Sequence, residues 1–98
     1  MTMEEFYNKY KTNRSYFAPI AGVGVRSLTK FENGETIRES TKTRIEKAMR
    51  VAEKYNLVRP EYNHAEALGM FGHWYNTKFQ SAVREYEAQF KKLIEEEI

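Results

Sequence analysis

Apolar residues recur at intervals of three or four positions along most of this chain, the spacing that predicts α-helices. In the first part of the chain this pattern is interrupted by glycine, asparagine and polar stretches. Gly22-Val23-Gly24 is expected to form a tight turn, because glycine adopts positive φ without a steric penalty. Ser40 is a suitable N-cap for the last of these helices. The pattern predicts four helices, over residues 3–11, 15–21, 25–31 and 41–55.

The remainder of the chain predicts one long amphipathic helix. Asn63, followed by Glu66 three residues later, is typical of a capping box at a helix start. A helix of about thirty residues would be about 50 Å long. Gly69 and Gly72 weaken its first turns, so a bend or a late start is expected there. The apolar positions step in an eleven-residue repeat, which predicts a nearly straight stripe. These positions are Leu68, Phe71, Tyr75, Phe79, Ala82, Tyr86, Phe90 and Leu93, widened by Trp74 and Val83.

Charge divides the chain in the same way. Residues 1–60 hold twelve Lys and Arg against seven Glu, whereas residues 61–98 hold four against seven. A basic first part is what binding to phosphate requires, although a solvated surface of this charge is also ordinary. The chain is 98 residues long, a length at which burial against a second chain would add useful stability.

Residues 15–34 resemble the helix-turn-helix of the lambda-repressor/Cro-like family of phage and bacterial transcriptional regulators. Ala18 occupies the small-residue position of the first motif helix and Gly22 the turn. Leu28 and Phe31 occupy the buried positions of the recognition helix, and Glu32-Asn33-Gly34 is the terminal signature. The resemblance covers residues 3–57. It implies an all-α fold with an N-terminal four-helix DNA-binding domain (1–57), a linker (58–63) and a C-terminal dimerisation helix (64–98).

The resemblance also implies a set of DNA contacts. The expected base contacts lie on the recognition helix: Val25, Arg26, Ser27 and Lys30. Arg26 can bond bidentately to guanine, and Val25 can contact a thymine methyl group. In the family a polar side chain is common at the position of Val25, and a polar cap at that of Gly24. The expected phosphate contacts are Arg14, Asn33, Thr36, Arg38, Lys42 and Arg44.

The apolar tail is expected to mediate homodimerisation. A bundle of about 60 residues cannot cover a stripe of this length, and an exposed stripe would promote aggregation. A second copy of the same helix would cover it and form a two-fold dimer that reads two half-sites about 34 Å apart. Folding of the tail onto the first domain is an open alternative. So is a protein-interaction or inhibitor module that uses the tail, with the helix-turn-helix as its scaffold.

Nothing in the sequence points to catalysis or to a cofactor. The chain has no cysteine, and its two histidines, His64 and His73, lack acidic partners at metal-ligand spacing. Phosphate-binding loops and nucleophile motifs are also missing. We therefore expect a cytoplasmic regulator, a repressor by preference, whose partners are double-stranded DNA and a second copy of itself.

Overall fold

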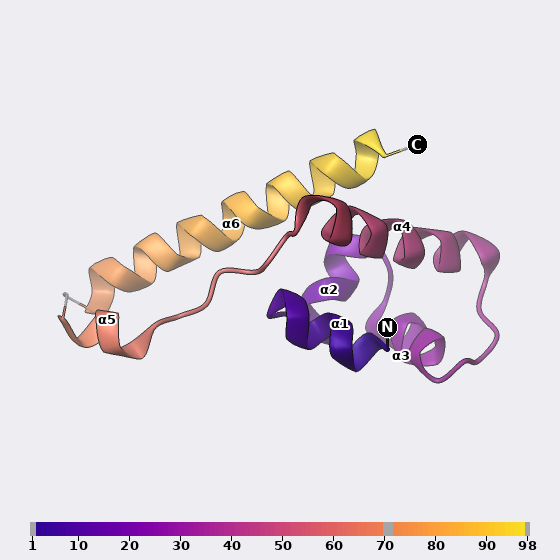
Figure 1. Cartoon of the computed structure of the whole chain (residues 1–98), viewed down its shortest axis with the longest axis horizontal. Helices are drawn as coiled ribbons and strands as arrows, with labels where there is room; N and C mark the ends of the chain where they lie inside the picture. The colour runs from indigo at the N-terminus through magenta and orange to yellow at the C-terminus, as the bar shows by residue number, and fades with distance from the viewer. Residues whose placement is uncertain (1, 70–71, 98) are drawn as a thin grey trace.

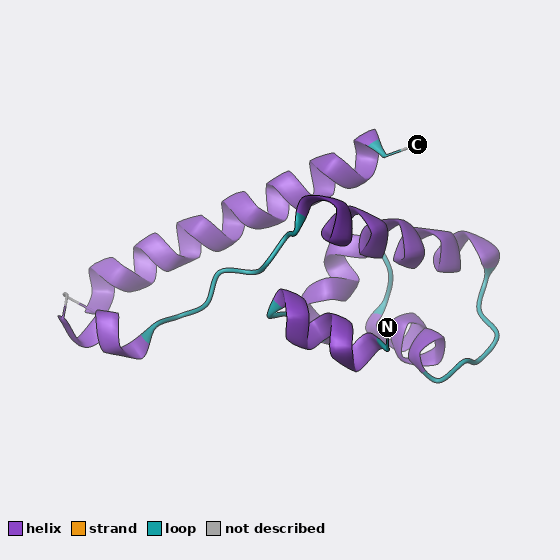
Figure 2. Cartoon of the chain, in the orientation of Figure 1, coloured by secondary structure: helices purple, strands orange, loops and turns teal. Residues whose placement is uncertain are grey.

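The structure is a computed structural model that describes residues 2–69 and 72–97. Within these two ranges the chain is all-helical, without a strand (Figure 1, Figure 2). The expectation of an all-α chain with a long C-terminal helix is confirmed. The helices are α1 (Met3–Tyr10), α2 (Arg14–Ala21), α3 (Val25–Glu32), α4 (Glu39–Tyr55), α5 (His64–Gly69) and α6 (Gly72–Glu96).

Local capping explains where the first helices begin and end. The Oδ1 atom of Asn13 accepts the backbone N–H of Tyr16 at 3.0 Å and so caps α2. Gly22, with φ of +75°, ends α2 in the left-handed conformation. The expected cap at Ser40 is wrong. The helix α4 begins one residue before Ser40, because the extended backbone of Arg38 places its carbonyl to accept the N–H of Lys42 at 3.0 Å.

The helices α1 to α4 enclose an apolar core. Phe6 is fully buried, and its ring lies 4.9 Å from that of Tyr10 and 5.0 Å from that of Phe17, between ring centroids. Leu28 on α3 and Ile45 on α4 are also completely inaccessible to solvent. These residues carry the apolar face of each helix, as the periodicity predicted.

The second half of α6 belongs to this same core. Tyr86 and Phe90 are buried in it, with the ring of Phe90 at 6.4 Å from that of Phe17. The Tyr86 hydroxyl donates to the carbonyl of Leu57 at 3.1 Å. In Figure 1 the end of α6 lies over the end of α4, and α6 and α4 are in contact. The tail is therefore not wholly separate from the domain formed by residues 1–57.

The first half of α6 extends away from the core as an arm, defined here as residues 60–69 and 72–82. The chain leaves α4 in an extended segment and reaches the short helix α5, which packs against the start of α6 (Figure 1). The uninterrupted helix expected over residues 64–98 is wrong, because α5 and α6 are separate helices that pack on one another. The late start expected near Gly69 and Gly72 agrees with the beginning of α6 at Gly72. The start expected after Asn63 is also right: the side chain of Asn63 caps α5 through the N–H groups of Ala65 and Glu66.

Across the described residues, no helix combines the length and the apolar character that crossing a membrane requires.

Candidate nucleic-acid interface

The turn between α2 and α3 is fixed from both sides. The N–H of Val23 donates to the carbonyl of Ala18 at 3.0 Å, which closes the end of α2. Gly24 then adopts an extended conformation, with φ of −77° and ψ of 153°, and α3 begins at the next residue. From α4, the Nη1 atom of Arg44 donates to the carbonyl of Gly22 at 3.2 Å. These contacts hold α3 at a set position relative to α2 and α4.

One side of α3 is buried and the other is open. Leu28 is completely buried, whereas Val25 is 45% exposed. Arg26 and Lys30 are exposed, and Ser27 is partly exposed. The ion pairs found among the described residues do not involve either of these two cations. The four residues predicted to contact bases are therefore at least partly accessible, and two of them, Arg26 and Lys30, carry positive charge.

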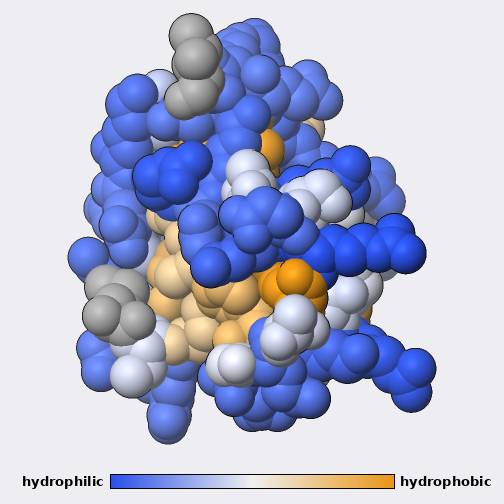
Figure 3. Space-filling view, turned by 90° about the vertical axis from the view of Figure 1, so that its right-hand side faces the viewer, coloured by the Kyte–Doolittle hydropathy of each residue, from blue (hydrophilic) through white to orange (hydrophobic). Residues whose placement is uncertain are grey.

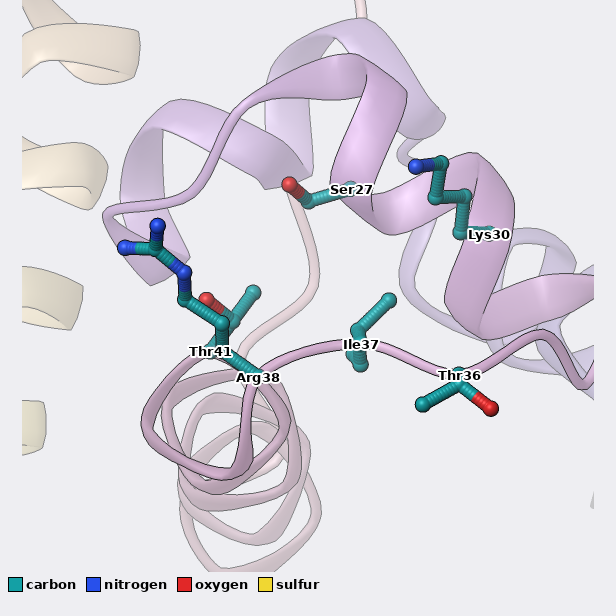
Figure 4. Close-up of a pocket in the computed structure, with 6 residues that line it drawn as sticks. All are labelled: Ser27, Lys30, Thr36, Ile37, Arg38 and Thr41. Atoms are coloured by element: carbon teal, nitrogen blue, oxygen red, sulfur yellow. The ribbon is translucent and has the colours of Figure 1, made fainter.

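A hollow of about 560 Å³ lies beside this surface, between α3 and the start of α4 (Figure 4). Ser27 and Lys30 reach it from α3, and Arg38 stands at the start of α4 on the opposite side. The full lining is Ser27, Lys30, Thr36, Ile37, Arg38 and Thr41. It contains two cations, three hydroxyl groups and no carboxylate, which is a suitable lining for an anionic oxygen such as that of a phosphate.

The residues predicted to contact phosphate are not all placed alike. Thr36 and Arg38 line the hollow, and Lys42 lines a second, neighbouring hollow of about 370 Å³ together with Glu35 and Glu39. That second hollow is partly apolar, and Figure 3 shows apolar surface framed by polar side chains at this end of the molecule. Asn33 is exposed at the end of α3.

Two of the predicted phosphate contacts are engaged within the protein. Arg44 bonds the turn, as described above. The Nε atom of Arg14 donates to the carboxylate of Glu32, which ties the start of α2 to the end of α3. This contact to Glu32 raises the pKa of Arg14. Both arginines thus position α3, a role that sequence reasoning did not assign to them.

Tyr7 lies beside the Arg14–Glu32 pair. Burial raises the pKa of its phenol to about 12, the charge of Glu32 adds to this, and the charge of Arg14 opposes it. At neutral pH the phenol is therefore un-ionised. Tyr7 supports the pair as a neutral neighbour and adds no negative charge near α3.

The residues predicted for dimerisation divide into two groups. Val83, Tyr86 and Phe90 are buried within the chain itself, so this part of the stripe is wrong as a surface for a second copy. Leu93 packs against the same core. The remainder lies on the arm: Leu68, Trp74, Tyr75, Phe79 and Ala82. Phe71 lies outside the described residues.

Sequence reasoning missed three residues that shape this region. Ile37 and Thr41 line the hollow between α3 and α4, and only the three-dimensional arrangement places them there. Arg59 lies in the predicted linker, and its guanidinium carbon stands 3.9 Å from the centroid of the Tyr16 ring on α2. The sequence signal for this contact was the position of Arg59 between Val58 and Pro60, where a charged side chain stands between two apolar residues.

No cluster of three or more possible metal ligands occurs within residues 2–69 and 72–97. Comparison with known proteins gave no match of any kind: no family model, no curated protein and no solved structure matches this chain.

Proposed function

We propose that this chain is a sequence-specific double-stranded DNA-binding protein, a transcriptional regulator that presents α3 to the major groove. The observation that carries the proposal is the open face of α3. Val25, Arg26 and Lys30 are exposed there, and they adjoin a hollow whose lining holds two cations and no carboxylate. The resemblance of residues 15–34 to a helix-turn-helix supports the same function.

The dimensions of α3 suit this role. A helix with its side chains is about 10–12 Å in diameter, which matches the width of the major groove, and the eight residues of α3 make it about 12 Å long. Gly24 immediately precedes α3, and Gly34 lies two residues after its end. Arg26 would read guanine through two hydrogen bonds, and Val25 would contact a thymine methyl group.

Phosphate binding would fix the position of α3 on the duplex. Lys30 on α3 and Arg38 just before α4 line the same hollow, and because their charged ends point in different directions (Figure 4), each would bind a backbone phosphate on its own side of the hollow. Thr41 adds a hydroxyl group beside Arg38, whereas the hydroxyl of Thr36 points away from both cations (Figure 4). A regulator held over a promoter in this way represses transcription by occlusion.

The substitution Arg26→Ala tests base reading. Affinity for the preferred sequence, selected from a random pool, should fall by about 1–3 kcal/mol, with preference lost at one base position. Arg84→Ala on α6 is the matched control, because it removes the same charge from an exposed site on another helix. Equal losses by Arg26→Ala on selected and random duplexes would contradict the proposed role.

The substitution Arg38→Ala tests the phosphate contact. It should weaken binding to all duplexes alike and reduce the slope of log K against log salt by about one unit. Titrations at several salt concentrations measure this slope. A slope equal to that of the unsubstituted protein would exclude Arg38 as a phosphate ligand.

A second candidate function is a protein-interaction module, favoured by the exposed apolar side chains of the arm, Trp74 at 53% and Leu68 at 88%. A gel-shift assay with random-sequence DNA separates the two candidates. Salt-sensitive binding at about 50 mM salt supports DNA binding, and no binding at that low salt supports the interaction module.

A further inference from the structure

The arm contains an apolar groove between its extended segment and α6. Tyr75, Phe79 and Ala82 lie on the α6 side, and Pro60 lies on the other side. The ring of Tyr62, from the extended segment, packs at 5.2 Å from that of Tyr75 and at 5.6 Å from that of Phe79. Three charged residues complete the lining of the groove, Glu61, Glu66 and Lys78.

The size of the groove limits what it can hold. Its volume is about 230 Å³. Sites for cofactors and drug-sized ligands are larger, at about 300–1,000 Å³. A cavity of this volume with a mostly apolar lining is suited instead to one large side chain of a protein partner.

A large side chain stands exposed on the same arm. Trp74 is 53% exposed and immediately precedes Tyr75 of the groove. Its ring carries the ammonium group of Lys78 at 5.1 Å from the ring centroid. Tryptophan is enriched among the residues that dominate binding energy at protein interfaces. The arm thus presents both an apolar anchor and a groove of matching size.

We propose that the arm pairs with the arm of a second copy of this chain, each copy inserting Trp74 into the groove of the other. In a two-fold dimer the same patch lies on both subunits. Trp74 of each copy would therefore occupy the groove of the other, and both contacts would form together. The small side chain of Ala82 leaves space for the indole ring.

The charges of the groove suit a second copy of the chain better than a nucleic acid or an anionic membrane. Its rim carries carboxylates at Glu61 and Glu66 and an ammonium group at Lys78. Glu61 is paired with Lys11 of its own chain, at 3.9 Å. Lys78 of one copy and Glu66 of the other can therefore face each other in both directions. A nucleic acid or an anionic membrane would instead require a rim of positive charge.

The pairing is expected to be weak in the absence of DNA. Residues 74–82 of α6 span only about 12 Å, so the interface falls at the small end of specific interfaces, below about 1,200 Å² in total. Binding of both subunits to one duplex would strengthen it by raising the effective concentration. Only this last consequence rests on the proposed function.

Trp74 is the single tryptophan of the chain, so tryptophan fluorescence reports on the surroundings of this one residue. As concentration rises from about 1 to about 100 μM, its emission should shift to the blue in parallel with dimer formation in analytical ultracentrifugation. Ala82→Arg, which fills the groove and keeps the probe, should abolish both changes. Gln89→Arg adds the same charge to an exposed position in the second half of α6 and should leave both changes intact.

Three results would overturn the proposal. The first is a monomer with unchanged Trp74 emission at about 100 μM, which would exclude a second copy as the occupant of the groove. The second is a dimer in which Trp74 emission does not shift. The third is an Ala82→Arg variant with a native circular dichroism spectrum that dimerises normally. Binding of that variant to a duplex with one half-site tests DNA recognition separately, because a monomer can still present α3.

Discussion

The two halves of α6 carry the same kind of aromatic and aliphatic stripe but meet different surroundings. In the second half, Tyr86 and Phe90 are buried against α2, α4 and the residues that follow α4. In the first half, Trp74 is largely exposed, and Tyr75 and Phe79 are covered only in part. The comparison teaches that an apolar stripe predicts which face of a helix is suited to burial, but neither whether that face is covered nor what covers it.

The difference follows from what each half contacts. Phe90 lies in a cluster of rings, 5.8 Å from Tyr86 and 6.4 Å from Phe17, which belongs to the four-helix domain. Phe79 has Tyr62, from the extended segment, as its aromatic neighbour at 5.6 Å. The second half of α6 should therefore unfold with the domain, whereas the arm should open at a lower free energy.

The largest effect is expected at the buried end of α6. Phe90→Ala should lower the free energy of unfolding by about 3–5 kcal/mol, because it removes a fully buried ring and leaves a cavity between α6 and α2. Urea unfolding followed by circular dichroism measures this loss. Gln89→Ala, at the neighbouring exposed position, should change stability by no more than about 0.5 kcal/mol. A loss below about 1 kcal/mol for Phe90→Ala would show that this half is not part of the core.

A smaller loss is expected when the hydroxyl of Tyr86 is removed. Tyr86→Phe leaves the buried carbonyl of Leu57 without its donor, which should cost about 1–3 kcal/mol. The same denaturant titration at neutral pH measures it. An unchanged free energy of unfolding would mean that the carbonyl is solvated when the hydroxyl is absent.

Tyr86 also predicts a dependence on alkaline pH. Burial raises its pKa from 10.0 to about 12. Stability should be fully present below about pH 10 and decline toward pH 12, because the unfolded chain loses this proton first. Tyr86→Phe should reduce the decline, and Tyr7, whose pKa is also raised to about 12, should account for the remainder. An equal decline in Tyr86→Phe would assign the whole effect to other groups.

The smallest effect on global stability is expected in the arm. Phe79→Ala should lower the free energy of unfolding by about 1 kcal/mol or less, because its ring is half-buried and its aromatic contact is with Tyr62. Hydrogen exchange should nevertheless become faster for the backbone amides of the arm and stay unchanged for α1 to α4. A loss as large as that of Phe90→Ala would make the two halves of α6 energetically equivalent.

Several local features could be predicted from residues alone. Gly22 ends α2 because glycine readily adopts the left-handed conformation, and Asn63 caps α5 through its side-chain oxygen. Both effects act over only a few residues. The buried position of Leu28 was expected from the resemblance of residues 15–34 to a helix-turn-helix, which leaves Arg26 and Lys30 on the open face. The assignment of these open residues to DNA bases stays a prediction.

Other features depended on contacts between distant segments. The pairing of Arg14 with Glu32 and the bond from Arg44 to Gly22 join residues 18 and 22 positions apart. A sequence pattern shows that such residues are charged but not which neighbour they meet. For that reason both arginines were predicted as phosphate contacts, although the structure gives each an internal partner.

By itself, the sequence determined the helical class of this protein, the turn between α2 and α3, and the polar face of α3. These properties arise from backbone conformation and side-chain spacing within one or two helical turns. Only the tertiary structure decided that α6 returns to the core with one half and leaves the other as an arm. Which half of α6 packs on the core depends on how closely its side chains fit those of distant segments. The periodicity of one segment does not reveal that fit.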